Sequence, residues 1–568
     1  MLLLVSSCIL ESGNAVDVDM AQHYRGDIRI TASGDIEGTD KISRNGNVYT
    51  LTENIDSDVA VARFFISIER DGAVFDGAGK TLQGINVGTA IAVIASDVTI
   101  KNVRIVNFGN GIEVGIHSEA VNIKIIDNYF ETRWQCLILG DIYVQGVVSG
   151  NTLNARNGNG VLFNSNGVAC IDNKFINCSL GILHETYPSV VSGNTINGKA
   201  LVFLVEQTNQ VIDGAGQVVL INCTNIVIQN ADTTRFNKPI ELIGVNNSWV
   251  THCKGPITLV NSHNNTLIDN EFSKIGGTWQ AAAVTLSSSN NNMVTQNSIV
   301  GLDSCGIIVG TVVFGNVIGT SAYNRIEKNT ISSSSSGLDN CAGIALSGYK
   351  NYVYENEITS EEFGLKLGGE YNVFFKNNVF QGKYSIFMDY ALYNDILGNN
   401  LSGASDSAVC LSSSDFNNIV WNNFKDTTKV IEIHETYQMT FTNSSYYAEY
   451  NKWDNGKEGN YWSDYNGQDT NGNGIGKTPY MVYENFTDNY PLTQPYDISK
   501  IQFTFEKWDD SSIDLQVHID PQLHADEVNV SKDFLIIAIV AVISGTIIAV
   551  VCVVFLRRFK NGSKTKAV

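Results

Sequence analysis

The residues best suited to holding a ligand lie near the C-terminus, in the short loop from Asp469 to Gly474. Asp469, Asn471 and Asn473 place oxygen donors at alternating positions, and Gly474 follows them. Oxygen donors in this spacing, followed by a glycine that permits a sharp turn, are typical of a Ca²⁺-binding loop. The loop therefore predicts Ca²⁺ as the cofactor.

The ligand set of this loop is incomplete. The twelfth position is Tyr480, where an EF-hand would supply a bidentate glutamate, and Lys477 adds a positive charge beside the loop. Asp464 or Asp488 could supply the missing oxygens from elsewhere in the chain. A plain Asn/Gly turn without a metal is the alternative interpretation.

The sequence gives little support for a copper site. Copper sites are built from clustered histidine, methionine or cysteine, whereas the histidines here are dispersed along the chain. Two of them begin the same four-residue word, His-Glu-Thr-Tyr, but they are separated by many repeats and cannot form one site. Copper is not predicted. The histidines are His23, His117, His184, His252, His263, His434, His518 and His524.

Several acidic pairs have the chemistry needed to cleave sugars. Hydrolases need two carboxylates on one face, and lyases need a base beside a uronate. The candidates are Asp269 with Glu271, Glu355 with Glu357, and Glu361–Glu362. Solvated charges in turns are the alternative for each pair.

A repeated phrase shows which elements position these residues. It reads Asn, any residue, apolar, two residues, Asn, any residue, apolar, and it recurs about every 22 residues, which is typical of a solenoid. Between the asparagines, apolar and polar residues alternate as in strands. Asparagine tolerates a left-handed backbone, and its amide can hydrogen-bond to the same residue in the next coil. These features predict a parallel β-helix. The phrase begins at Asn265, Asn292, Asn324, Asn351, Asn372, Asn394 and Asn417, and a looser copy gives Asn128, Asn151, Asn173 and Asn194.

The composition limits the classes of partner that the protein can bind. The chain has 568 residues, 43% of them hydrophobic, and a formal net charge of −21, so it can fold but repels nucleic acid and anionic lipid. No nucleic-acid partner is expected. The cysteines occupy apolar positions, which favours buried thiols over a metal cluster, with one or two disulfides between coils as the alternative.

The C-terminal part of the chain predicts an anchor. Residues 534–556 carry no charge and are long enough to span a bilayer, and the basic residues after them place the tail in the cytoplasm. We therefore expect a single-pass membrane protein with its β-helix outside, carrying sequons that are consistent with a glycosylated surface. The predicted parts are a signal segment (1–15), an N-terminal cap (16–60), the β-helix (61–435), an aromatic C-terminal cap (436–496), a stalk (497–533), a transmembrane helix (534–556) and a basic tail (557–568).

Three segments resemble a known family: Ser189–Ile196, Asn209–Asn225 and the closing Gly459-Asn-Tyr-Trp-Ser-Asp-Tyr. They are similar to the NosD-like family as it occurs in archaeal surface proteins. The resemblance covers about residues 45–495 and implies a right-handed parallel β-helix of a group that contains carbohydrate-binding proteins and sugar hydrolases. The family name comes from a periplasmic factor for copper-site maturation, a role that need not transfer to a surface relative.

Three functions remain open from the sequence. The first is non-catalytic binding of glycan or cell-envelope polysaccharide along stacked side chains, and it is the one we favour. The second is a polysaccharide hydrolase or lyase, and the third is an accessory factor for metal-enzyme maturation or envelope assembly. An aromatic ladder on one face would favour binding, and converging carboxylates would favour catalysis. Ligand identity and oligomeric state do not follow from the residues.

Overall fold

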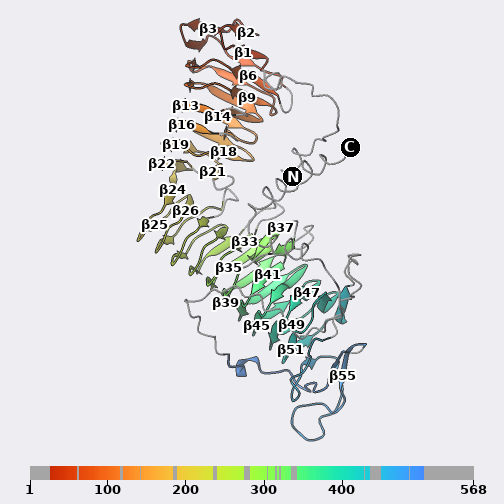
Figure 1. Ribbon diagram of the computed structural model, residues 1–568. Coiled ribbons are helices and arrows are strands. Elements are labelled where there is room, and N and C mark those ends of the chain that lie inside the picture. The colour runs from red at the N-terminus through yellow and green to blue at the C-terminus, as the bar shows by residue number, and fades with distance from the viewer. Residues whose placement is uncertain are drawn as a thin grey trace, which may run out of the picture. The chain divides into compact units, whose positions relative to one another are not determined.

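The fold is that of a computed structural model, and it is an all-β right-handed parallel solenoid of about 15 turns. The structure describes residues 26–503 except 60–62, 116–118, 141–142, 183–187, 235–239, 274–281, 303–304, 314–315, 319–320, 334–341, 428, 435–449 and 485. Each coil contributes up to three short strands, and each strand pairs in parallel with its equivalents in the coils before and after it (Figure 1). The prediction of a parallel β-helix is confirmed.

The N-terminal stack has three sheets. Sheet I contains β1 (Ile28–Ile30), β2 (Ile36–Glu37), β6 (Phe64–Ile68), β9 (Thr89–Val93), β12 (Asn110–Val114), β15 (Leu137–Leu139), β18 (Asn159–Phe163) and β21 (Ser179–Ile182). Sheet II contains β3 (Ile42–Asn45), β4 (Val48–Leu51), β7 (Val74–Asp76), β10 (Thr99–Lys101), β13 (Ala120–Ile126), β16 (Val144–Ser149), β19 (Val168–Ile171) and β22 (Val190–Ser192). Sheet III contains β5 (Ile55–Asp56), β8 (Thr81–Gln83), β11 (Arg104–Phe108), β14 (Tyr129–Thr132), β17 (Thr152–Ala155), β20 (Lys174–Phe175) and β23 (Thr195–Ile196).

The C-terminal stack also has three sheets. Sheet IV contains β24 (Lys199–Val205), β26 (Gln217–Ile221), β28 (Ile240–Ile243), β30 (Ile257–Val260), β33 (Ala282–Ser287), β36 (Cys305–Val309), β41 (Ala342–Tyr349), β44 (Phe363–Glu370), β47 (Tyr384–Leu392), β50 (Ser407–Ser412) and β53 (Lys429–His434). Sheet V contains β25 (Val211–Asp213), β27 (Val227–Gln229), β29 (Trp249–Thr251), β31 (Thr266–Ile268), β34 (Met293–Thr295), β39 (Arg325–Glu327), β42 (Tyr352–Tyr354), β45 (Val373–Phe375), β48 (Asp395–Leu397) and β51 (Asn418–Val420). Sheet VI contains β32 (Glu271–Ser273), β35 (Ser298–Leu302), β40 (Thr330–Ser333), β43 (Glu357–Ser360), β46 (Asn378–Phe380), β49 (Asn400–Ser402), β52 (Asn423–Lys425) and β54 (Tyr461–Trp462).

Three smaller elements complete the described residues. The hairpins β37 (Thr311–Val313) with β38 (Asn316–Ile318) and β55 (Tyr480–Tyr483) with β56 (Phe486–Asp488) are antiparallel, and the short 3₁₀-helix η2 covers Ile498–Lys500.

The two stacks are joined by an antiparallel pair. Strand β23 ends sheet III and pairs antiparallel with β24, which begins sheet IV. Gln217 reaches across this joint: its Nε2 donates to the carbonyl of Leu180 at 2.8 Å, and its Oε1 accepts from the Leu180 amide at 3.0 Å. A buried side chain thus supplies both hydrogen bonds that a further strand would give to β21.

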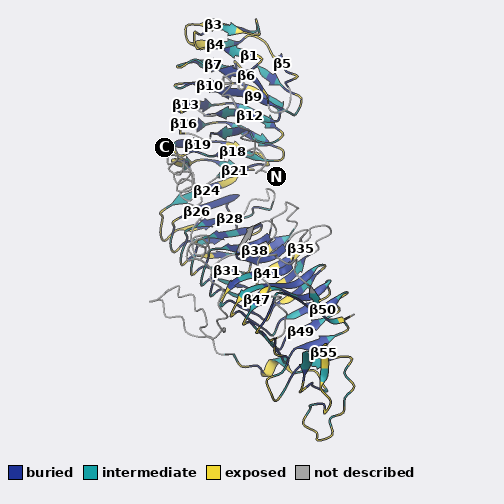
Figure 2. Ribbon diagram, turned by 45° about the vertical axis from the view of Figure 1, so that its right-hand side comes forward, coloured by how far each residue is buried: buried dark blue, intermediate teal, exposed yellow. Residues whose placement is uncertain are grey.

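Inward-facing side chains form a hydrophobic core in each stack, and the strands are mostly buried or half-buried (Figure 2). The cysteines belong to this filling. All seven described cysteines are buried free thiols, in agreement with the predicted apolar role. Burial raises the pKa of Cys170 to about 12, so this thiol stays protonated at neutral pH.

The repeated asparagines form buried columns, as predicted. Asn399 shows the pattern of one column. Its Oδ1 accepts from the backbone N and the Nδ2 of Asn377, both at 3.0 Å. Its Nδ2 donates to Oδ1 of Asn422 at 3.0 Å and to the carbonyl of Phe374 at 3.1 Å. One column turns the chain from sheet IV to sheet V, and a second turns it from sheet V to sheet VI. The first column is Asn265, Asn292, Asn324, Asn351, Asn372, Asn394, Asn417 and Asn451, and the second is Asn270, Asn297, Asn329, Asn356, Asn377, Asn399, Asn422 and Asn460.

One part of the asparagine prediction is wrong. The left-handed backbone at these turns belongs to the residue before the asparagine, as at Lys376 and Trp421, and the asparagines of the columns do not have positive φ. Asparagine is required there because its amide both donates and accepts, whereas the preceding position takes residues of several types.

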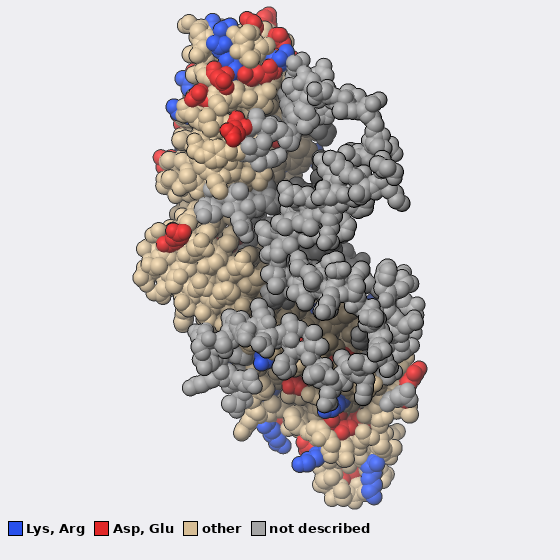
Figure 3. Space-filling model, in the orientation of Figure 1, with Lys and Arg blue, Asp and Glu red and all other residues tan. Residues whose placement is uncertain are grey.

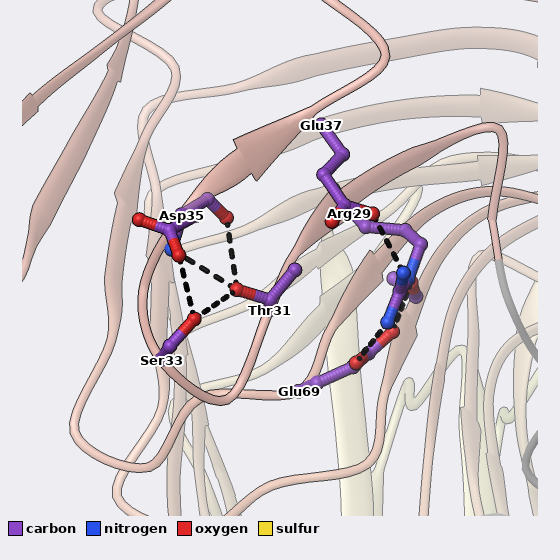
Figure 4. A network of polar contacts seen from close by, with 7 residues as sticks. Arg29, Thr31, Ser33, Asp35, Glu37 and Glu69 are labelled. Atoms are coloured by element: carbon purple, nitrogen blue, oxygen red, sulfur yellow. Dashed lines mark hydrogen bonds and ion pairs between the residues drawn. The ribbon is translucent and has the colours of Figure 1, made fainter.

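The first described coil is closed by polar contacts at its open edge (Figure 4). Strand β2 folds back antiparallel on β1. Arg29 bridges the coil: it forms a bidentate pair with Glu69 at 2.8 and 2.7 Å and a further bond to Glu37 at 2.6 Å. Beside it, Thr31 and Asp35 close the turn that leads into β2.

At the other end, residues 450–503 lie against the last coil. Strand β54 pairs with β52, and Trp462 stacks on Phe424 with ring centroids 4.4 Å apart, which continues the apolar filling by one more ring. The buried Asp488 accepts from the indole Nε1 of Trp462 at 2.9 Å and from the amide of Asn460 at 2.8 Å. Gly459 leaves the space for this carboxylate, because a Cβ there would meet its oxygen.

No helix among the described residues is long and apolar enough to cross a bilayer. The predicted segment 534–556, the signal segment 1–15 and the tail 557–568 lie outside the described residues. On the face drawn in Figure 3, charged side chains gather over the first and the last coils, and the described surface between them is mostly uncharged.

Candidate functional site

A row of aromatic side chains runs along the corner between sheets IV and V. It is called the aromatic row below, and it is defined as Tyr323, Tyr349, Tyr371, Tyr393, Phe416 and Tyr450. From Tyr371 onward the rings are parallel: the centroids of Tyr371 and Tyr393 are 5.3 Å apart, those of Tyr393 and Phe416 are 5.1 Å apart, and those of Phe416 and Tyr450 are 5.2 Å apart. The spacing is that of the coils, because each ring comes from one coil.

The ring of Tyr349 departs from this alignment. It is edge-on to Tyr323 at 6.1 Å and to Tyr371 at 5.5 Å. The reason lies in the backbone, because in this coil Lys350 takes the position before the column asparagine and Tyr349 is one residue earlier. The Nζ of Lys350 lies 5.2 Å from the centroid of the Tyr349 ring.

The row is exposed to solvent. Tyr371 is 42% exposed, Phe416 43% and Tyr450 61%. Because the parallel rings cover one another's faces, they present their edges outward, with a phenol hydroxyl at each tyrosine. Within the part of the chain that the structure describes, the hydroxyls of Tyr393 and Tyr450 make no hydrogen bond. The row is thus a ridge of apolar edges and hydroxyl groups repeated once per coil.

Tyr323, Tyr371, Tyr393 and Phe416 all have a left-handed backbone, with φ between 56° and 61°. Bulky residues rarely adopt this conformation, and it costs free energy. In earlier coils the same position, before the column asparagine, is held by Asn264 and Asn291.

The predicted Ca²⁺ loop is tightly hydrogen-bonded to its own backbone. The Asp469 carboxylate accepts from the amides of Gly472 and Gly474, both at 2.7 Å, and these bonds lower its pKa. Asn471 and Asn473 each accept from the backbone amide two residues on. Asp469, Asn471 and Asn473 therefore face one small loop, as a turn requires, and the Oδ1 of Asp469 already accepts from the amides of Asn471, Gly472 and Asn473.

The two acidic residues considered as additional ligands are directed elsewhere. Asp464 accepts from the hydroxyl of Tyr480 at 3.0 Å, and the Asp488 carboxylate is turned toward Trp462. Among the described residues no three His, Cys, Asp or Glu side chains are grouped so that they could hold a metal ion.

The acidic pairs considered for catalysis are in contact with lysines of neighbouring coils. Glu271 lies 2.9 Å from the Nζ of Lys254, and Glu362 lies 4.0 Å from that of Lys383. Glu355 lies 3.9 Å from the Nζ of Lys328. Such contacts are typical of solvated charges in turns.

A second group of titratable residues lies on the outer face of sheet IV. Lys366 is 7% exposed, and its Nζ lies 5.6 Å from the ring centroids of both Phe363 and Phe387. The hydroxyl of Tyr384 donates to Asp406 at 3.5 Å. Burial raises the pKa of Tyr384 well above its usual range and that of Cys410 to about 12. Both groups are therefore held in their protonated forms, which are not those of a base or a nucleophile.

The sequence interpretation overlooked the aromatic row. Its signal is present in the repeats, because Tyr371, Tyr393 and Phe416 each directly precede an asparagine of the repeated phrase.

The coils, the asparagine columns and the register define a right-handed parallel β-solenoid. Within it, residues 320–467 match the family model described as "Periplasmic copper-binding protein (NosD)". The recognised resemblance to NosD is thereby confirmed for this region, which contains the whole aromatic row. Among curated proteins, none matches this chain.

The solved structures that match this chain share little sequence with it. DFA-IIIase from Arthrobacter chlorophenolicus A6 without its lid is 14% identical, with 57% of this chain and 84% of that chain covered and a TM-score of 0.28. The tailspike protein of E. coli bacteriophage HK620 in complex with pentasaccharide is 11% identical, with 62% and 72% covered and a TM-score of 0.28. The periplasmic alginate epimerase AlgG is 9% identical, with 71% and 80% covered and a TM-score of 0.24.

The described residues do not fit the copper that the family description implies. His263 accepts a hydrogen bond from the backbone of Asn290 through its Nδ1 at 3.0 Å, and His252 contacts its neighbour Thr251. Burial raises the pKa of the Cys253 thiol to about 11 and that of Cys170 to about 12. A copper site needs several such ligands together, and the described residues bring no three His, Cys, Asp or Glu side chains into a group that could hold a metal ion.

Proposed function

We propose that this protein binds a polysaccharide of the cell envelope or its surroundings along the aromatic row, without cleaving it. The observation that carries the proposal is the exposed row itself, with rings from successive coils 5.1–5.3 Å apart between Tyr371 and Tyr450. A repeating surface of this kind suits a repeating ligand, because every sugar unit meets the same group in the next coil.

The chemistry of the row supports a sugar ligand over a protein or a lipid. Sugar hydroxyls both donate and accept, as phenol hydroxyls do, and the C–H groups of a pyranose ring pack against aromatic carbon. The spacing between neighbouring rings of the row is about the length of one sugar unit in an extended glycan. The net charge of −21 disfavours strongly anionic polymers.

The proposal of binding without cleavage rests on what the candidate catalytic groups do. The carboxylates Glu271, Glu355 and Glu362 are in contact with lysines. On the outer face of sheet IV, the titratable side chains Tyr384 and Cys410 are buried and held protonated.

The proposal also includes how the binding surface is presented. Segment 534–556 would anchor the chain in a membrane with the solenoid outside. Residues 450–496 would act as a cap, because an open last coil exposes strand edges. Ca²⁺ held by Asp469, Asn471 and Asn473 would stiffen this cap.

A binding experiment with the full-length chain tests the proposal. The protein is presented to a glycan array and to insoluble polysaccharides of bacterial and archaeal envelopes, and bound protein and released reducing ends are both measured. We expect binding without release. The variant Tyr393→Ala with Phe416→Ala, which removes two adjacent rings, should weaken binding at least tenfold, about 1.4 kcal/mol.

Trp249→Ala provides the matched control, because Trp249 is an exposed aromatic residue (53%) on sheet V in coils before the row. It should bind as the unchanged protein does. Equal loss in both variants would overturn the assignment of the row, and release of reducing ends would overturn binding without cleavage.

A further inference from the structure

A cavity of about 740 Å³ lies beside the last three rings of the aromatic row. Its floor is the outer face of sheet V, where Leu397 and Val420 supply apolar surface. Asp395, Asn418 and Lys452 line the side next to the row, each two residues after a ring of the row in its own coil. The far wall is formed by Trp421 and by segments of the chain that follow the last coil, including Asp454 and Asn489.

The polar groups of the cavity are held in place by one another. The Asp395 carboxylate accepts from the Nδ2 of Asn418 at 2.7 Å. The Asp454 carboxylate fixes the far wall, because it accepts from the backbone N and the Nδ2 of Asn489 at 2.9 and 3.0 Å and from the amide of Gly456 at 2.9 Å. A wall that is already ordered loses little conformational entropy when a ligand binds.

The indoles add the features of a sugar site. Trp421 donates its Nε1 to Glu458 at 3.1 Å and stacks on Tyr496 with centroids 5.7 Å apart, so its ring is fixed. Trp453 also lines the cavity, and its buried Nε1 has no hydrogen-bond partner among the described residues. A buried donor without a partner costs free energy.

The charged side chains of the cavity favour uncharged sugars over acidic ones. Lys452 makes no ion pair with any described residue, and Asp395 and Asp454 bring two carboxylates to the same cavity. A ligand carrying its own carboxylate would add a third negative charge against one ammonium group. The apolar floor, the fixed indole and the amides match an uncharged ring with hydroxyl groups.

We infer that this cavity binds a neutral hexose unit, as a separate subsite beside the aromatic row. The inference rests on the proposed function only in placing that hexose within the glycan bound by the row. The volume lies within the range of small-molecule sites. The C–H face of the sugar would pack on the apolar floor, and its hydroxyl groups would hydrogen-bond to Asp395 and Asn418.

The test uses free sugars and the full-length chain. Glucose, galactose, mannose and N-acetylglucosamine are titrated one at a time by calorimetry and tryptophan fluorescence, with glucuronate as the acidic comparison. At least one neutral sugar should bind with a dissociation constant of about 1 mM, which is typical of weak single-site recognition. Asn418→Ala should weaken this binding about tenfold.

Asn400→Ala is the matched control, because Asn400 lies on the outer face of sheet VI and, like Asn418, donates its Nδ2 to a side-chain oxygen of the preceding coil, here Oδ1 of Asn378 at 2.6 Å. It should bind the sugar unchanged. No saturable binding of any neutral sugar, equal affinity in Asn418→Ala, or tighter binding of glucuronate would each overturn the inference.

The two proposals fail separately. If the protein binds polysaccharide but no free hexose, the proposed hexose site in the cavity is refuted and the proposed role of the aromatic row is retained. If the protein binds no polysaccharide but binds a free hexose, and the Tyr393→Ala, Phe416→Ala variant still binds that hexose, the hexose site is supported and the role of the aromatic row is refuted.

Discussion

The buried asparagine column gives the sharpest prediction for stability, through the variant Asn399→Ala. Its amide oxygen is the acceptor for two donors of Asn377, the backbone N–H and one Nδ2–H, both at 3.0 Å. The other Nδ2 hydrogen of Asn377 is occupied by the carbonyl of Val353 at 2.9 Å. The substitution therefore leaves two buried donors without an acceptor.

Each buried donor that loses its acceptor costs about 1–3 kcal/mol, so the expected loss is about 2–6 kcal/mol. The adjacent Asn400 is the internal control, because it is the same residue type in the same coil but points outward and is half-buried. Asn400→Ala removes two part-buried amide contacts, with Asn378 and Asn423, and should cost about 1–2 kcal/mol, less than Asn399→Ala.

Urea unfolding followed by tryptophan fluorescence is the assay, since Trp421, Trp453 and Trp462 all report on the C-terminal stack. A solenoid can unfold in parts, so the midpoint of this local transition is compared, not a global free energy. A midpoint for Asn399→Ala no lower than that for Asn400→Ala would refute the claim that the columns hold the coils together.

Three further outcomes follow. Burial raises the pKa of Asp488 from 3.8 to about 6. The contribution of this carboxyl group to stability is therefore present in full below pH 3.8 and is lost as the pH rises through 6. The last coil should resist urea better at pH 5 than at pH 7.5, and the variant Asp488→Asn should reduce this difference. Gln217→Ala removes both bonds to Leu180; amide hydrogen exchange at β21 should accelerate by at least tenfold while exchange in β12 is unchanged. The buried Cys136 thiol, whose pKa is raised, should react with a disulfide reagent only after denaturation.

The sequence was sufficient for the solenoid because the information is local and repeated. Each coil contains the same Asn–x–apolar phrase, so spacing alone predicts the columns as far as Asn417 and Asn422. The last rungs, Asn451 and Asn460, lie outside the repeated phrase and were not predicted. The motif beginning at Gly459 was recognised as a closing segment, but its role in accommodating Asp488 depends on a contact between residues far apart in sequence.

The joint and the cavity could not be predicted. The reversal between β23 and β24 has no distinctive composition, and Gln217 is an ordinary polar residue until the chain brings it to Leu180. The cavity combines the outer face of sheet V with the segments around Asp454 and Asn489. No period in the sequence specifies which outer face such a segment covers.

Stability alone does not account for the aromatic row. Placing Tyr371, Tyr393 and Phe416 in the left-handed region costs about 1–2 kcal/mol each, and each stacked pair returns about 0.5–1.5 kcal/mol. The two contributions nearly cancel, while about 40% of the surface of Tyr393 and Phe416 stays in water. Asn264 and Asn291 fill the same turn position at lower cost, because asparagine tolerates this backbone. The binding role proposed for the row accounts for bulky rings at this exposed position, where folding does not require them.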